Sequence, residues 1–160
     1  MPNWCANNFG LKGPKEKIQE LWTKIQEQNE LLEVLVPLGE WNYMSSVEGW
    51  GTKWDVEIDG LEIEEEGDNA TIFGWFDSAW SPPTDAYETF IQNNPDCYIE
   101  ATFYEEGMQF IGRWENDEET VFEDIQELLM DGFENPIFLD LVEEYEVQLY
   151  EEEPEYEDAD

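Results

Sequence analysis

The sequence predicts a single folded α+β domain, and three observations support this fold class. The chain has 160 residues, the usual length of one domain with a sizeable core. Its residues are 41% hydrophobic and 15% aromatic, whereas disordered acidic chains are usually poor in aromatic residues. Segments with the apolar period of a helix alternate with segments that have the period of a strand. Together these features predict helices packed on a sheet.

The first third of the chain predicts a strand followed by a helix. Residues 4–13 have the composition of a strand, and the Gly–Pro pair at residues 13 and 14 ends it. A helix is predicted next, because apolar residues recur at i, i+3, i+4 and i+7: Ile18, Leu21, Trp22 and Ile25. The segment over residues 31–51 contains Pro, Gly and Trp and is predicted to be partly irregular.

The middle of the chain predicts two pairs of strands with a helix between them. WDVEID at residues 54–59 and LEIEEE at residues 61–66 alternate apolar and acidic residues, which predicts half-buried strand segments. A turn over residues 67–69 precedes an aromatic-rich strand, and Thr84 is predicted to cap a helix that runs through Gln92. CYIEATFYEEGMQFIGRWE, beginning at Cys97, then predicts a strand, a turn and a strand.

The predicted order through Glu115 is strand, helix, two strands, helix, two strands. This order fits an antiparallel α+β sandwich of the ferredoxin-like, split-βαβ kind. The name refers to topology only, because an iron–sulfur cluster needs four cysteines and the chain has two, Cys5 and Cys97. We expect both thiols to be buried and free.

The last third predicts an acidic helical extension over residues 117–150, packed on the core of residues 1–116, and a flexible acidic tail over residues 151–160. EETVFEDIQELLMD at residues 118–131 is predicted to be a helix that ends before Gly132. Asn135 and Pro136 predict the cap and first position of another helix. EVQLY at residues 146–150 is predicted to add a final strand.

The charge of the chain is large and uneven. The 42 acids and 6 bases give a formal net charge of -36, far beyond the magnitude of about 2 to 8 that keeps a small domain soluble. Residues 1–56 hold five Lys and eight acids, whereas residues 115–160 hold twenty acids and no base. Such a field repels nucleic acid and anionic membranes and attracts basic protein surfaces. MPNWCANN at residues 1–8 has neither the basic nor the apolar region of a signal peptide, and no apolar run approaches about 20 residues, so we expect a cytoplasmic protein.

Four motifs resemble a known family. They are MPNWCANN at residues 1–8, WGTKWD at residues 50–55, FDSAWSPP at residues 76–83 and YEEGMQFIG at residues 104–112. In this order they resemble the YubB-type ferredoxin-like family of plasmid and bacteriophage proteins, over about residues 1–116. The resemblance implies the fold and an origin in a mobile element, with the host cytoplasm as the location. It implies no catalytic residue, and the acidic extension departs from the shorter family pattern.

The sequence favours a protein that is not an enzyme. It contains no His, no Gly-rich phosphate loop and no nucleophile elbow, and among 42 acids a pair of carboxylates carries no information. We expect no cofactor and no metal site, although the carboxylates of residues 115–119 could attract a calcium ion without the EF-hand spacing. Trp50, Trp54, Trp75 and Trp80 could form a stacking platform, but core packing is the expected role.

Acidic rows suggest that the chain mimics nucleic acid. Along the predicted helix, acids four residues apart advance about 6 Å per step, and alternate strand positions lie about 6.7 Å apart. These separations are close to those of phosphates, so we expect the chain to occupy the basic surface of a host nucleic-acid-binding protein without binding nucleic acid itself. The helical row comprises Glu119, Glu123, Asp124, Glu127 and Asp131, with Glu143, Glu144 and Glu146 extending it and Glu62, Glu64 and Glu66 forming a second edge.

A second hypothesis explains the same acids without a partner. The chain would be a structural or adaptor protein whose acidity serves solubility or adaptation to high salt. The concentration of acids toward the C-terminus favours mimicry, because solubility does not require charge to be polarised along the chain. Under either hypothesis, exposed strand edges would allow two chains to pair as a homodimer.

Overall fold

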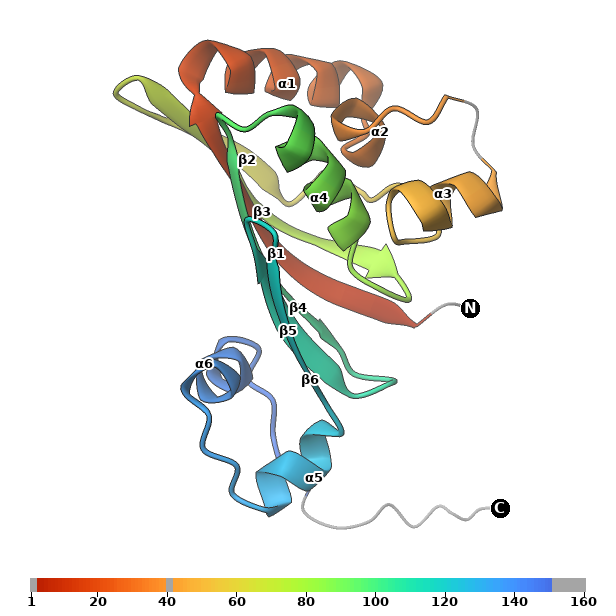
Figure 1. Cartoon of the computed structure of the whole chain (residues 1–160), viewed down its shortest axis with the longest axis vertical. Helices are drawn as coiled ribbons and strands as arrows, with labels where there is room; N and C mark the ends of the chain where they lie inside the picture. Colours follow the sequence, from red (N-terminus) through yellow and green to blue (C-terminus); the bar gives the residue numbers. More distant parts are fainter. Residues whose placement is uncertain (1–2, 40–41, 151–160) are drawn as a thin grey trace.

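The computed structural model describes residues 3–39 and 42–150 of the chain. In this part, six strands form one antiparallel sheet in the order β2-β3-β1-β4-β5-β6 (Figure 1). The strands are β1 (Trp4–Pro14), β2 (Leu61–Glu66), β3 (Asn69–Ala79), β4 (Tyr98–Glu105), β5 (Phe110–Glu115) and β6 (Glu118–Glu123). The helices are α1 (Lys15–Gln28), α2 (Leu32–Leu35), α3 (Tyr43–Gly49), α4 (Thr84–Asn93), α5 (Ile125–Met130) and α6 (Pro136–Glu144).

The first four strands confirm the predicted ferredoxin-like class. The units β1–α1–β2 and β3–α4–β4 interlock, so that each places one strand between the two strands of the other. The central strand β1 pairs with β3 from Trp4 opposite Ala79 to Pro14 opposite Asn69, and with β4 along its other side. The strands β5 and β6 extend the sheet beyond β4.

The larger core lies on the sheet face covered by α1, α2 and α4, which we call the α1 face. Side chains alternate along β1, and Phe9 and Leu11 point into this core. Ile18 and Ile25 of α1 are fully buried against it, as the helical period predicts. The helix α1 ends where Asn29 adopts a left-handed conformation with φ of 59°.

A second core lies on the opposite face of the sheet, under α5 and α6, and we call this the α6 face. Ile111 of β5 is buried there with Ile125, Phe138 and Leu141. Figure 1 shows α5 and α6 at the other end of the molecule from α1. The helix α6 begins as predicted, because the Asn135 side chain accepts the N–H of Phe138 at 3.2 Å and Pro136 occupies the first turn. One sheet therefore separates two cores.

The predicted acidic helix over residues 118–131 is wrong, because residues 118–123 form β6. This strand pairs with β5 from Glu115 opposite Glu118 to Phe110 opposite Glu123. Asn116 and Asp117 join the two strands with φ of 44° and 84°, as both central positions of a tight hairpin require. A separation of four residues returns a side chain to the same face of a strand as well as of a helix, so the spacing of the acids could not distinguish the two.

Residues 54–59 form no strand, contrary to the prediction. The pairing of β2 with β3 ends at Leu61 opposite Gly74, and the segment before it leaves the edge of the sheet. Its alternation nevertheless identifies the buried side chains, since Val56 and Ile58 belong to the larger core while Glu57 is exposed. An alternating pattern thus reports which residues are buried even where no neighbouring strand is available.

Two element ends also differ from the predictions. The helix α4 begins at Thr84, and Pro83 holds the cap position without a side-chain hydrogen bond, so Thr84 is not the cap. Residues 146–150 form no strand. The Gln126 side chain, and not a neighbouring strand, hydrogen-bonds their backbone: it donates to the Gln148 carbonyl and accepts the Tyr150 N–H, both at 2.9 Å. The predicted tail over residues 151–160 lies outside the described residues.

Candidate partner-binding surface

The predicted row of acids on β2 exists. Glu62, Glu64 and Glu66 are exposed, and alternate strand positions share a face at separations of about 6.7 Å. They project on the α6 face, since Ile63 between them packs against the core of the α1 face. The strand β2 is an edge of the sheet, so this row is accessible from the side as well as from above.

The predicted helical row does not exist as a row. Glu119 and Glu123 lie on β6 and project on the α1 face, while Asp124 has a left-handed backbone with φ of 56°. Glu127 lies in α5, which spans 6 residues, and Asp131 follows its end. Because β2 and β6 are opposite edges of the sheet, Glu119 and Glu123 lie at the other edge from the β2 row, and they also project on the other face.

Glu119 instead lies near two acids of α4. Partial burial raises the pKa of the Glu119 carboxyl, and the charges of Asp85 and Glu88 raise it further. Between α4 and β6 lies a shallow groove of about 270 Å³. Its lining includes Asp85, Phe103, Phe110, Glu119, Val121 and Glu123. No local sequence pattern predicts this cluster, because α4 and β6 are far apart along the chain.

Among the acids at the end of α6, Glu144 has a structural role. Its carboxylate accepts hydrogen bonds of 2.6 Å from Asn8 Nδ2 on β1 and of 2.6 Å from Thr102 Oγ1 on β4. These bonds fasten the end of α6 to the centre of the sheet. The other two predicted acids of this group, Glu143 and Glu146, are exposed.

Asp55 is an acid that sequence reasoning missed, and it also serves the fold. Its Oδ1 accepts the N–H groups of Leu31 at 3.2 Å, Leu32 at 2.8 Å and Val56 at 2.8 Å, and its Oδ2 accepts that of Glu33 at 2.9 Å. Burial raises the pKa of Asp55, whereas the four N–H donors lower it. The effect of burial is larger, so the pKa of the folded protein lies above the usual value. Asp55 thereby caps α2 from more than twenty residues away, a role without a local sequence signal.

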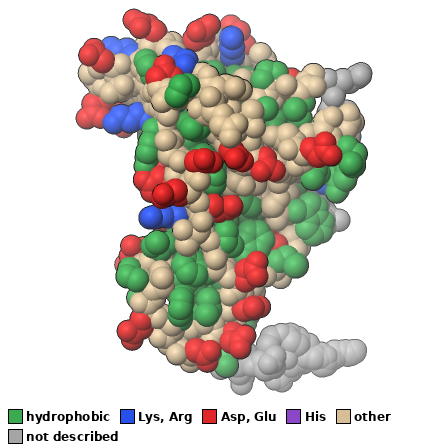
Figure 2. All heavy atoms as spheres, in the orientation of Figure 1, with side chains coloured by type: hydrophobic (Ala, Val, Ile, Leu, Met, Phe, Trp, Pro, Cys, Tyr) green, Lys and Arg blue, Asp and Glu red, His purple; other side chains and the backbone are tan. Residues whose placement is uncertain are grey.

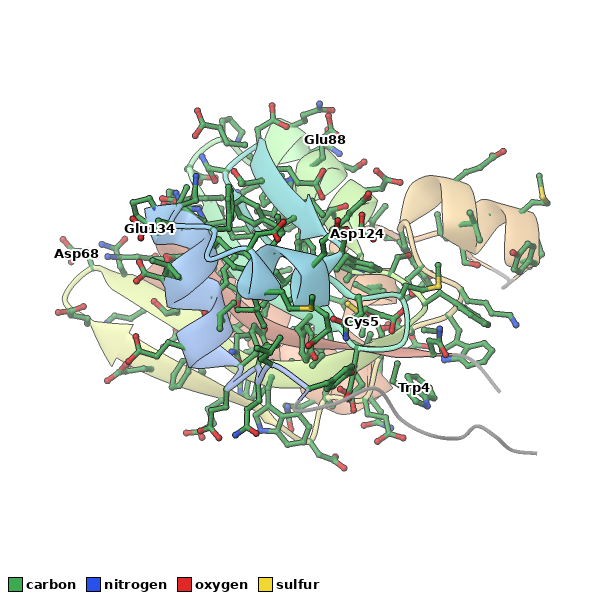
Figure 3. The ribbon with its side chains drawn as sticks, turned by 90° about the horizontal axis from the view of Figure 1, so that it is seen from below. Trp4, Cys5, Asp68, Glu88, Asp124 and Glu134 are labelled. Carbon is green, nitrogen blue, oxygen red and sulfur yellow. The ribbon has the colours of Figure 1, made fainter. Side chains whose placement is uncertain are left out.

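The charge surrounds the molecule and is not confined to one face. Asp68 and Glu88 lie at different sides of the molecule (Figure 3). Lys and Arg side chains gather mainly at the upper end, around α1, in Figure 2. One of them, Lys17, pairs with Asp96 at 2.8 Å. The elements β6, α5 and α6 themselves contain no Lys or Arg. Arg113 of the neighbouring strand β5 lies beside α6 and pairs with Glu115 at 3.9 Å, so one base faces many acids at this end.

The tryptophans divide between the core and the surface. Trp50 is 3% exposed, and its indole N–H donates to the Val36 carbonyl at 2.9 Å, as the core-packing prediction expects. For Trp75 and Trp80 that prediction is wrong, because they are 59% and 45% exposed. A single exposed apolar side chain is ordinary, whereas several that gather in one hollow mark a binding site.

The described residues show little sign of reactive chemistry. Burial raises the pKa of Cys5 to about 12 and that of Cys97 to about 11, so neither buried thiol is a nucleophile at neutral pH. Within residues 3–39 and 42–150, no three His, Cys, Asp or Glu side chains are grouped as metal ligands. No helix in the same part of the chain has the length and apolar character needed to cross a membrane.

Residues 49–153 match the family model described as "Ferredoxin-like domain in Api92-like protein". The chain belongs to this family. The matched range contains every element from β2 to α6, and so it includes residues 117–150 together with much of the predicted core. Comparisons with curated proteins and with solved structures found no match. Membership of the family establishes the fold, and a function has to be argued from the surface.

Proposed function

We propose that this chain is a non-catalytic acidic protein that occupies the basic surface of a host nucleic-acid-binding protein and inhibits it. One observation carries the proposal: residues 115–160 hold twenty acids and neither Lys nor Arg. In the structure, the described part of this segment forms β6, α5 and α6 at one end of the molecule. Carboxylates at this density repel one another in the isolated chain, and a basic partner relieves that repulsion.

The arrangement of the acids favours a cleft as the partner's binding surface. The row on β2 and the pair Glu119 and Glu123 on β6 lie at opposite edges and on opposite faces of the sheet, so a flat basic surface reaches only one of them at a time. A cleft that normally holds a nucleic acid is lined by Lys and Arg on more than one side. The chain would then imitate the charge of nucleic acid by its overall field and not by a single helical row.

The four sequence motifs that resemble the YubB-type family support a further part of the proposal, an origin in a phage or plasmid. In the cytoplasm of a bacterial host, the targets that fit are proteins with basic clefts, such as a defence nuclease or RNA polymerase. An inhibitor of this kind has no direct affinity for nucleic acid, because its own charge repels the phosphates.

A second candidate function is supported by the edges of the sheet. Both edge strands carry acids, with Glu62, Glu64 and Glu66 on β2 and Glu118, Glu119 and Glu123 on β6. Charged side chains on edge strands discourage pairing with other chains. The acids would then protect a structural or adaptor protein from aggregation, and the same feature argues against a homodimer formed through these edges.

The test compares two acidic regions with a matched control. Three variants of equal charge change are compared: Glu62, Glu64 and Glu66 to Gln on β2; Glu123 and Glu127 to Gln with Asp131 to Asn near α5; and Glu16, Glu20 and Glu27 to Gln on α1. Affinity capture from a nuclease-treated host lysate supplies the partner, and duplex DNA or RNA is used to displace it. Each of the first two variants should weaken binding about tenfold, while the α1 control should change it less than twofold.

The outcomes separate the two candidates. A stoichiometric partner that nucleic acid displaces, with a loss of affinity confined to the first two variants, supports the inhibitor. Equal losses in all three variants mean that only net charge matters. If basic proteins are released together at low salt, the inhibitor proposal is wrong and the acids serve solubility.

A further inference from the structure

Three exposed or half-buried tryptophans line a hollow at the N-terminal end of β1. The hollow has a volume of about 410 Å³ and lies where β3 continues beyond the end of β2. We call it the tryptophan pocket and define it by Trp4, Trp54, Glu57, Asp59, Trp75 and Asp77. None of these residues belongs to the acid rows or to the groove beside α4, so the pocket is a separate site.

The aromatic walls of the pocket are held in place by the backbone. The rings of Trp4 and Trp54 lie 6.2 Å apart, centroid to centroid, at 57°. The indole of Trp75 rests against Gly60, where a Cβ atom would lie 2.6 Å from the ring, and the backbone N–H of Trp75 donates to the Gly60 carbonyl at 3.3 Å. Trp4 and Trp75 are nevertheless 46% and 59% exposed. Figure 3 shows Trp4 pointing away from the sheet. The fold therefore holds large apolar surfaces in position without covering them.

The pocket is also negatively charged. Glu57 and Asp59 are exposed because Val56 and Ile58, which alternate with them, are buried in the larger core. Asp77 follows Trp75 by two positions on β3 and shares its face. The fourth lining carboxylate, Asp55, accepts four backbone N–H groups and is already occupied. Among the described residues, no Lys or Arg lines the pocket.

One cation of the chain already uses an aromatic wall of this region. The Lys53 ammonium lies 5.1 Å from the centroid of the Trp54 ring and 6.0 Å from that of Tyr43. An ammonium over the face of an indole is attracted by the negative charge of the π system. The aromatic faces and the carboxylates of this region both favour a positive charge.

We infer that the tryptophan pocket binds the ammonium end of a lysine side chain carried by a basic polypeptide. The aromatic faces pack against the alkyl stem and attract the ammonium, while Glu57, Asp59 and Asp77 supply the opposite charge. A nucleobase is disfavoured because the carboxylates repel its phosphate. A neutral sugar gains nothing from the charge, and carboxylates offer its hydroxyls acceptors but no donors.

A polypeptide suits the pocket better than a free amine, because the wide exposed area of Trp4 and Trp75 needs a larger ligand to cover it. In one respect the inference rests on the proposed function, namely that the basic partner carries the lysine. Cation binding by the pocket itself does not depend on that partner.

The experiment uses the full chain labelled with ¹⁵N at the indole nitrogens. The probe is an acetylated, amidated pentapeptide with one central Lys between glycines, compared with the same peptide carrying Nε-acetyl-lysine or norleucine. The Lys peptide should shift the indole signals of Trp4, Trp54 and Trp75 and leave that of the buried Trp50 unchanged. The two uncharged peptides should bind at least about fivefold more weakly, because they lack the ammonium.

Variants with matched controls locate the site. Trp4→Leu and Asp77→Asn should each weaken binding of the Lys peptide about threefold to fivefold. Trp80→Leu removes an exposed tryptophan outside the pocket, and Asp68→Asn removes a distant charge, so both should leave the affinity unchanged. Asp77→Asn retains the shape of the side chain and keeps the test valid if Trp4→Leu disturbs the fold.

The inference is overturned if the norleucine peptide binds as well as the Lys peptide, or if only maltose or cellobiose shifts the three indoles. The inference is also overturned if about 20 mM Lys peptide shifts none of the three indole signals, because the Kd would then be weaker than the millimolar values of ordinary weak binding. Binding of the Lys peptide without a basic host partner refutes the proposed function alone. This inference alone is refuted if a host partner binds the Trp4→Leu and Asp77→Asn variants with unchanged affinity and the Lys peptide shifts none of the three indole signals.

Discussion

Replacing Asp55 with Ala should destabilise the fold by about 2–4 kcal/mol. One carboxylate accepts four backbone N–H groups at 2.8–3.2 Å and replaces a local cap for α2. A cap bond of this kind contributes about 1 kcal/mol, which gives about 4 kcal/mol for four bonds. Burial of the charge, which raises the pKa of Asp55, cancels part of this gain. The expected loss corresponds to a decrease in Tm of about 4–16 °C for a domain of this size.

The assay is equilibrium unfolding in urea, followed by tryptophan fluorescence and checked by calorimetry. Asp55→Asn retains one acceptor oxygen for the three N–H groups at Oδ1, so it should lose about half as much stability as Asp55→Ala. Asp59→Asn changes an exposed acid on the same segment and should alter stability by less than about 0.5 kcal/mol. A loss below about 0.5 kcal/mol for Asp55→Ala would refute this account of α2.

Three further changes test other parts of the structure. The folded pKa of Glu119 is raised by partial burial and by its acidic neighbours, so its ionised carboxylate destabilises the fold as the pH rises. Glu119→Gln should therefore be more stable at pH 7, by less than about 1 kcal/mol because most of the side chain remains in contact with solvent, and urea unfolding should show that this gain vanishes below about pH 4. Asp117→Gly places the residue best suited to φ of 84° in the β5–β6 turn and should raise stability by about 0.5–1 kcal/mol; a loss in thermal unfolding would contradict the hairpin. Glu144→Ala removes two hydrogen bonds that fasten α6 and should speed amide exchange in α6 but not in α1; equal acceleration in both helices would argue against a local role.

The sequence could predict elements whose signals are local. The spacing of Ile18 and Ile25 identifies α1, and Asn135 with Pro136 marks the start of α6, because periodicity and capping depend on neighbouring residues. The sequence also contains a local signal for the turn at Asn116 and Asp117. Asn and Asp tolerate positive φ, and the β-branched residues Thr120 and Val121 that favour a strand follow them. The helical interpretation gave priority to the repeated acids over this turn.

The candidate sites were less predictable, because they depend on contacts between distant segments. Asp55 meets the start of α2 only after the chain has passed through α3, and Glu119 meets Asp85 only once β6 has joined the sheet. The exposure of Trp75 likewise follows from the point at which β2 stops pairing with β3. Composition indicated that the surface is acidic, and tertiary structure determines which acids meet one another, which fasten the fold and which remain available.

The strand β5 forms a shared wall between the two cores, and this gives the molecule two folding units of unequal size. Trp114 packs with Tyr87 in the larger core at a centroid distance of 5.5 Å, whereas Ile111 on the same strand belongs to the core under α6. We expect the smaller unit to open more readily than the four-stranded part, because fewer buried side chains hold it closed. Such a partial opening would release α5 and α6 together with β6, and the acidic end would then be free to adapt its shape to a partner.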